Sequence, residues 1–288
     1  TANNREQIGY TGVDGENLVI PETFQGDDGT WYRVTEIDYQ AFKSCTNLVT
    51  VTIPAGVKMI DAWAFSGCSN LTSVSLSEGV ASIALEAFSN CTSLTSITIG
   101  SSVTSIGDEA FYNCKELSAF TWDAESKLVG RLAFGNCVKL TDFDFVNVEK
   151  LYVNSFLGSG VNVVQLGETE NESSRTPLTT VEVQSFMDCD NLATLGIGGN
   201  VTTIKTQAFA NCENLETAVI ADSVTEIAED AFDGCDKLTI YCSENSYAHT
   251  YAQTQGINVS TFVIAPIPNQ TYTGFEIKPD ISVSASGD

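Results

Sequence analysis

Hydrophobic residues recur along this chain with a period of about 23 residues. Each repeat carries the pattern Ala-Phe-x-x-Cys-x-x-Leu or a close variant, as in Ala64-Phe65 followed by Cys68 and Leu71. The nine Phe residues of the pattern are Phe42, Phe65, Phe88, Phe111, Phe134, Phe156, Phe186, Phe209 and Phe232, separated by 23, 23, 23, 23, 22, 30, 23 and 23 residues. A fixed period of roughly 20 to 30 residues indicates stacked coils, each of which buries its apolar face against its neighbours.

Within a repeat, the pattern predicts two extended pieces and a turn. Residues 71–76 alternate apolar and polar positions, which is typical of a short strand with one buried face. Val80 and Ile83 lie three apart and predict a second, shorter extended piece on the opposite side of the coil, after a turn at Gly79. The Ala-Phe segment then predicts one short helical turn with Phe and Cys pointing inward.

These elements predict a β-rich, right-handed solenoid: a stack of about nine 23-residue repeats with short helical turns. We expect residues 1–33 to form an N-terminal capping segment, with a hairpin whose turn lies at Gly26–Thr30. Residues 34–260 form the solenoid and its terminal cap. Tyr247 and Tyr251 lie four apart, on one face of a short capping helix that Gly256 ends.

Two stretches depart from the repeat. The 30-residue interval contains a polar insertion, Glu168–Pro177, which predicts a projecting loop that is either a contact or an insertion without function. Residues 261–288 have a different composition and predict a linker or the truncated start of an immunoglobulin-like surface module.

Charge and composition exclude several classes of partner. The net charge is −24, from 37 acidic and 13 basic residues, and a field of this sign repels nucleic acid and anionic lipid. No stretch approaches the roughly 20 apolar residues of a membrane span, so we expect no membrane insertion. The chain begins at Thr1 and is acidic and rich in Ser, Thr and Asn, which suits an exported protein from which an upstream segment is missing.

The residues that usually carry chemistry are sparse or repetitive. Eight of the nine Cys residues occupy one slot of the repeat and no Cys-x-x-Cys pair exists, which favours a column of buried thiols over a metal or redox site. His249 is the single His and has no imidazole partner for nucleophilic catalysis. We therefore predict no enzyme activity, no catalytic residues, no cofactor and no bound metal.

The outward-facing positions of the strands are the candidate binding residues. Three repeats present a ladder of hydroxyl groups: Thr50, Thr52, Ser73, Ser75, Ser96 and Thr98. The next two repeats add Trp122, Asp123, Asp142 and Asp144, with Phe120, Phe143 and Phe145 at inward positions. An acidic patch beside an aromatic ring suits a sugar, a calcium ion or a basic peptide. The alternatives are a merely solvated sheet face and a Trp122 packed inside the core.

The pattern Leu-x-x-Val/Ile-x-Leu/Ile, then Val-x-x-Ile, then Ala-Phe-x-x-Cys resembles the BspA-like, Treponema-type class of bacterial leucine-rich repeats over residues 34–258. Commoner classes place Asn eight residues after the first Leu, a slot that Asn200 alone fits here. The resemblance implies a secreted or cell-surface, non-catalytic adhesion module. It would bind a host extracellular-matrix or cell-surface protein through the sheet face and loops, as a monomer. The alternatives are a carbohydrate-binding accessory module that uses Trp122, Asp142 and Asp144, and a structural spacer.

Overall fold

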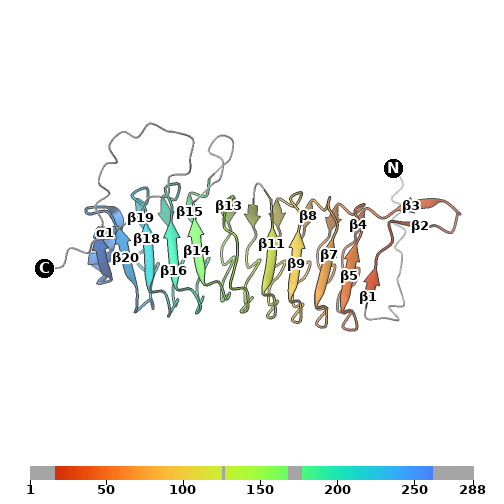
Figure 1. The fold of residues 1–288 in the computed structure, drawn as a ribbon, viewed down its shortest axis with the longest axis horizontal. Helices are drawn as coiled ribbons and strands as arrows, with labels where there is room; N and C mark the ends of the chain where they lie inside the picture. Colours follow the sequence, from red (N-terminus) through yellow and green to blue (C-terminus); the bar gives the residue numbers. More distant parts are fainter. Residues whose placement is uncertain (1–16, 125–126, 168–176, 262–288) are drawn as a thin grey trace, which may run out of the picture.

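The computed structural model describes residues 17–124, 127–167 and 177–261, which form a solenoid of coils stacked along one long axis (Figure 1). The predicted leucine-rich repeat solenoid is therefore confirmed. The polar insertion after Gly167 and the composition change after residue 261 fall almost entirely outside the described residues.

One side of the solenoid carries two parallel sheets, here called the front sheets. The first comprises β1 (Asn17–Val19), β5 (Thr50–Ile53), β7 (Ser73–Leu76), β9 (Ser96–Ile99) and β11 (Ala119–Trp122). The second comprises β14 (Val163–Leu166), β16 (Thr194–Ile197), β18 (Thr217–Ile220), β20 (Thr239–Cys242) and β21 (Asn258–Thr261). Equivalent repeat positions pair directly, such as Val51 with Val74, because the repeat length matches one coil.

The opposite side carries the shorter strands that the Val-x-x-Ile spacing predicts. One back sheet comprises β4 (Glu36–Ile37), β6 (Met59–Ile60), β8 (Ser82–Ile83), β10 (Ser105–Ile106), β12 (Lys127–Val129) and β13 (Val148–Leu151). The other comprises β15 (Thr180–Val181), β17 (Thr203–Ile204) and β19 (Glu226–Ile227). The Val and Ile side chains of these strands cover the core on the side opposite the front sheets.

The Ala-Phe segments form tight turns that bond to the next coil. In one coil, the Cys68 amide donates to the Phe65 carbonyl at 3.1 Å, an i to i+3 bond. The Phe65 amide donates to the Ala87 carbonyl of the next coil at 2.8 Å. Trp63 (φ 57°) and Gly67 (φ 75°) adopt left-handed backbone conformations on either side of the Phe. The short helical turns expected here are thus hydrogen-bonded turns without an α-helix.

The repeated Phe side chains form one continuous ladder through the core. Each ring stacks on the equivalent ring of the next coil, with centroid separations of 5.1–5.6 Å and interplanar angles of 3–14°. Such offset stacking adds to the free energy gained from burying each ring.

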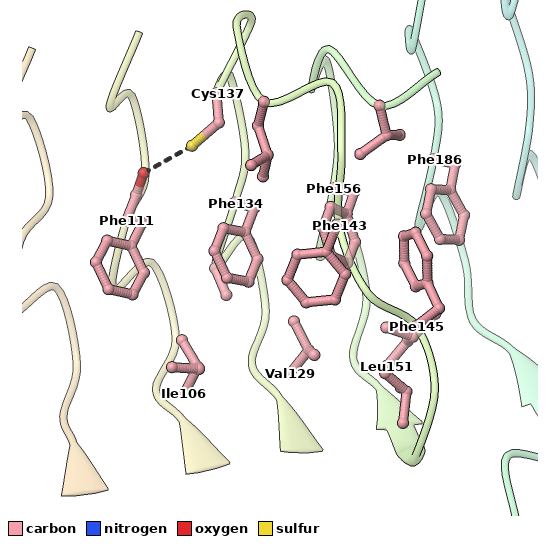
Figure 2. Packing of buried hydrophobic residues seen from close by; sticks show 14 of the residues in the cluster. Ile106, Phe111, Val129, Phe134, Cys137, Phe143, Phe145, Leu151, Phe156 and Phe186 are labelled. Carbon is pink, nitrogen blue, oxygen red and sulfur yellow. Dashed lines mark hydrogen bonds between the residues drawn. The ribbon is translucent and has the colours of Figure 1, made fainter. Parts of the chain in front are cut away.

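The repeated Cys side chains form a second column beside the Phe ladder. Figure 2 shows the Cys137 thiol bonded to the Phe111 carbonyl of the preceding coil. Seven cysteines make this bond, with sulfur–oxygen distances of 3.0–3.2 Å: Cys68, Cys91, Cys114, Cys137, Cys189, Cys212 and Cys235. The predicted buried thiol column is confirmed, and the structure adds that each of these thiols satisfies a backbone carbonyl.

The N-terminal hairpin forms where the sequence predicts it. β2 (Thr23–Gln25) and β3 (Trp31–Arg33) pair in an antiparallel arrangement. Asp28 accepts hydrogen bonds from the amide and hydroxyl of Thr30, which hold the turn and lower the pKa of this carboxyl. The hairpin projects beyond β1 along the long axis (Figure 1), and Trp31 is 67% exposed, so these strands extend outward from the stack.

The C-terminal end carries the predicted helix, α1 (Tyr247–Gln255). The Ser246 hydroxyl caps its first turn, and Gly256 ends it in a left-handed conformation with φ 69°. Tyr251 packs near Phe232, the last ring of the ladder, with a centroid separation of 6.2 Å. No helix in the described part of the chain is long and apolar enough to cross a bilayer.

Candidate functional site

The hydroxyl ladder that the sequence predicts lies in strict register on the first front sheet. Thr50, Ser73 and Ser96 pair side by side and form one column. Thr52, Ser75 and Thr98 form the second, and all three are exposed. The six hydroxyl-bearing residues therefore make a flat polar surface, because side chains two positions apart share one face of a strand.

The front side is interrupted at the coil that follows β11. The alternating residues Asp142, Phe143, Asp144 and Phe145 predict a strand, but the structure forms none over 141–147. The inward placement of the rings is confirmed, because Phe143 is 9% exposed and Phe145 is 5% exposed. The expectation of a strand over these residues was wrong.

Inward rings and a local turn bond accompany this interruption. β11 carries rings, Phe120 and Trp122, at the same inward positions and still pairs with β9, so ring size alone does not prevent a strand. In the interrupted coil, Phe143 reaches the Phe ladder at 4.9 Å from Phe156, centroid to centroid (Figure 2). Phe145 lies 5.7 Å from Phe186 in the same way. The Val146 amide also donates to the Asp144 carboxylate at 2.9 Å, a local turn bond that competes with strand pairing.

A groove of about 490 Å³ lies at this interruption. Its lining comes from three stretches of chain: Phe120, Thr121, Trp122 and Asp123 at β11, residues 142–146 beneath, and Val163 and Gln165 on β14. The sequence singled out the first two stretches together. The sequence did not indicate that β14 lines the groove, because Val163 and Gln165 belong to the next coil and carry no distinctive motif.

Trp122 requires a correction as a surface binding residue. Its side chain is 3% exposed, and its indole nitrogen donates to the Val103 carbonyl at 2.6 Å. Trp122 pairs with Ile99 of the preceding coil and so takes an inward position. The alternative of a packed Trp122 is the one observed, and its ring face is not available for stacking on a ligand at the surface.

Beneath the groove lies a buried cation that sequence reasoning did not identify. The Lys127 side chain is 1% exposed, and its ammonium bonds to the Asp144 carboxylate at 2.6 Å and to the Asp144 carbonyl at 3.2 Å. The same ammonium lies 6.0 Å from the centroid of the Trp122 ring. The sequence does show that this repeat is unusual. Ser126, the residue before Lys127, replaces the Val of the Val-x-x-Ile spacing found in other repeats.

The groove carboxylates are spread out rather than gathered into a metal site. Asp123 and Asp142 are exposed, and the Asp144 side chain is 61% exposed beside Lys127. Their ligand atoms are not all within 4.8 Å of one another. Among the described residues, that criterion is met only by Glu36, Asp38 and Asp61 on and beside the back sheet, two of which already accept backbone hydrogen bonds.

His249 serves the fold at the C-terminal cap. It lies in α1, and its Nδ1 accepts a hydrogen bond from the Asn245 amide at 3.2 Å, while its own amide donates to the Ser246 hydroxyl at 3.1 Å. These bonds fix the start of the helix.

Comparison with solved structures finds bacterial leucine-rich repeat proteins. A leucine-rich repeat protein from Bacteroides ovatus is 18% identical, with 88% of this chain and 93% of that chain covered and a TM-score of 0.36. A leucine rich cell surface protein from Faecalibacterium prausnitzii is 21% identical, with 84% and 91% covered and a TM-score of 0.34. A leucine-rich repeat protein from T. pallidum is 22% identical, with 85% and 86% covered and a TM-score of 0.39.

A search of curated proteins finds no match. The family model of the BspA type leucine rich repeat region matches residues 35–162 and 168–266 in six copies. These ranges take in most of the chain and agree with the repeat read from the sequence. The chain belongs to the BspA-type leucine-rich repeat family.

Proposed function

We propose that this chain is a non-catalytic protein-binding module of a secreted or cell-surface bacterial protein, and that it acts in adhesion. The observation that carries the proposal is the exposed, in-register hydroxyl surface of β5, β7 and β9 beside the groove. A rigid sheet surface of this kind offers many weak contacts to a broad partner without reorganising. Membership of the BspA-type family and the acidic composition are consistent with export.

The alternative of a carbohydrate-binding module has less support. Sugar recognition at this place would use the face of the Trp122 ring, which is buried. The spacer alternative predicts no specific binding at all, so the experiment below separates it from the proposal.

The test is an array of host matrix and cell-surface proteins probed with the purified chain. We expect binding to at least one protein, lost when Ser75→Arg and Thr98→Arg place bulky charges on the hydroxyl surface. The matched control is Thr202→Arg with Thr225→Arg, two exposed hydroxyl residues beside the back strands β17 and β19. Absence of binding on the array, or equal loss with both variant pairs, would overturn the proposal.

A further inference from the structure

The groove lies where the front side lacks one strand. Among the described strands, β11 is the last of one front sheet and β14 is the first of the other. The coil between them forms no strand over 141–147, so among the described residues no strand pairs with the outer edge of β11. A strand at a sheet edge presents backbone groups that can pair with an incoming chain.

The lining of the groove combines apolar surface with negative charge. Phe120 is only partly buried and Val163 is 52% exposed, so both offer apolar surface. The lining includes three carboxylates, those of Asp123, Asp142 and Asp144, and the buried Lys127 ammonium pairs with Asp144. The groove therefore carries an excess of negative charge, and the chain as a whole carries a net charge of −24.

The positions of these groups favour one of the three ligand classes considered for this patch, which are a sugar, a calcium ion and a basic peptide. A sugar could not stack on the Trp122 ring, because that ring is buried. A single metal ion would need carboxylate oxygens gathered around one point, and these are not. Several cations spaced along an extended chain fit the separated carboxylates and the unpaired edge of β11.

We propose that the groove binds an extended, lysine- or arginine-rich peptide segment of a partner protein, which adds a strand beside β11. Alternate side chains of a strand point to the same face, so cationic residues at every second position would meet Asp123 and Asp142 in turn. Their aliphatic stems would lie on Phe120 and Val163. This inference rests on the protein-binding function proposed above and specifies the partner chemistry of one site.

The test measures fluorescence anisotropy of a dye-labelled ten-residue peptide in which lysine alternates with threonine, titrated with the full chain. The variant pair Asp123→Asn and Asp142→Asn removes two groove charges. The matched control pair Asp190→Asn and Asp222→Asn removes two exposed charges from coils beyond β14. We expect about tenfold weaker binding with the groove pair, because two charge-assisted contacts are lost, and less than about twofold with the control pair.

Strand addition has its own readout. Methylation of alternate backbone nitrogens of the peptide removes the hydrogen-bond donors along one edge of the peptide strand. When the methylated edge is the one that faces β11, we expect binding to weaken about tenfold. Peptide binding should also slow amide hydrogen exchange in residues 119–122. A peptide that binds without either effect would overturn the strand-addition part of the proposal.

The outcomes separate this inference from the broader function. Equal weakening by the groove pair and the control pair would mean general attraction to an acidic surface, and the inference would be wrong. Binding on the protein array that persists in the groove pair, with no peptide binding, would also overturn the inference while leaving the proposed function intact. Groove-dependent peptide binding without array binding would support the inference and count against adhesion to the arrayed proteins.

Discussion

At the scale of single residues, the cysteines contribute to stability as protonated hydrogen-bond donors. Burial raises the pKa of Cys68, Cys137 and Cys189 to about 12. Because the thiolate is the reactive form, these thiols are inert in the folded chain at neutral pH. Ser159, which occupies the same slot in the sixth repeat, instead lies 3.5 Å from the Cys189 sulfur.

The raised thiol pKa values predict a loss of stability at high pH. Below the ordinary thiol pKa of 9.0, both folded and unfolded chains are protonated and the stabilisation is fully present. As the pH rises from there through about 12, the unfolded chain loses protons first and becomes favoured. Urea unfolding at pH 7 and at about pH 10.5 should show this decline. It should be smaller in the variant Cys137→Ala with Cys189→Ala, and an equal decline would contradict the explanation.

The ion pair below the groove should respond unequally to removal of its two partners. Asp144→Ala leaves the Lys127 ammonium buried without its carboxylate, and we expect it to lower the free energy of unfolding by about 2–3 kcal/mol. Lys127→Met removes the buried charge and keeps the volume, so we expect a change within about 1 kcal/mol. Urea denaturation of the two variants and of the double variant measures this. A larger loss from Lys127→Met than from Asp144→Ala would contradict it.

At the scale of elements, the coil between β11 and β14 differs from the others on the front side, where a turn bond from the Val146 amide to the Asp144 carboxylate takes the place of strand pairing. Residues 141–147 form no strand, so their amides are not held by sheet pairing on the front side. We expect hydrogen exchange in this segment to be faster than in β9, whose amides lie inside a sheet. Mass spectrometry of peptides covering 141–147 and 95–99 makes the comparison, and equal protection would be evidence of a paired strand.

The sequence predicted those elements in which each repeat position keeps its usual residue type. The strands β5, β7 and β9, the Phe ladder and the helix that Gly256 ends all follow from periodicity or local capping. The interrupted coil does not, since Asp142 to Phe145 alternates like a strand and that alternation does not reveal the turn bond from the Val146 amide to the Asp144 carboxylate. Residue pairs joined across coils, such as Lys127 with Asp144, were also hidden, because 17 positions separate them.

At the scale of the whole molecule, the two halves of the solenoid are joined by turns and side chains rather than by continuous sheets; the Phe156 amide, for example, donates to the Ser185 carbonyl of the next coil at 2.8 Å. The front side is interrupted between β11 and β14, and the back side between β13 and β15. The Phe ladder crosses both interruptions without a gap, with centroid separations of 5.1 Å from Phe134 to Phe156 and 5.3 Å from Phe156 to Phe186. Phe156 also contacts Phe143 and Phe145, so it is the centre of this junction (Figure 2).

This position of Phe156 predicts that its removal separates the unfolding of the two halves. Phe156→Ala should cost about 3–5 kcal/mol, and because coils contact only their neighbours, the loss falls on the junction. We expect the urea unfolding curve to divide into two transitions. Phe88→Ala removes an equally buried ring where both sheets are continuous, so its curve should shift without dividing. A single transition for Phe156→Ala, or a divided curve for Phe88→Ala as well, would contradict this special role of the Phe156 junction.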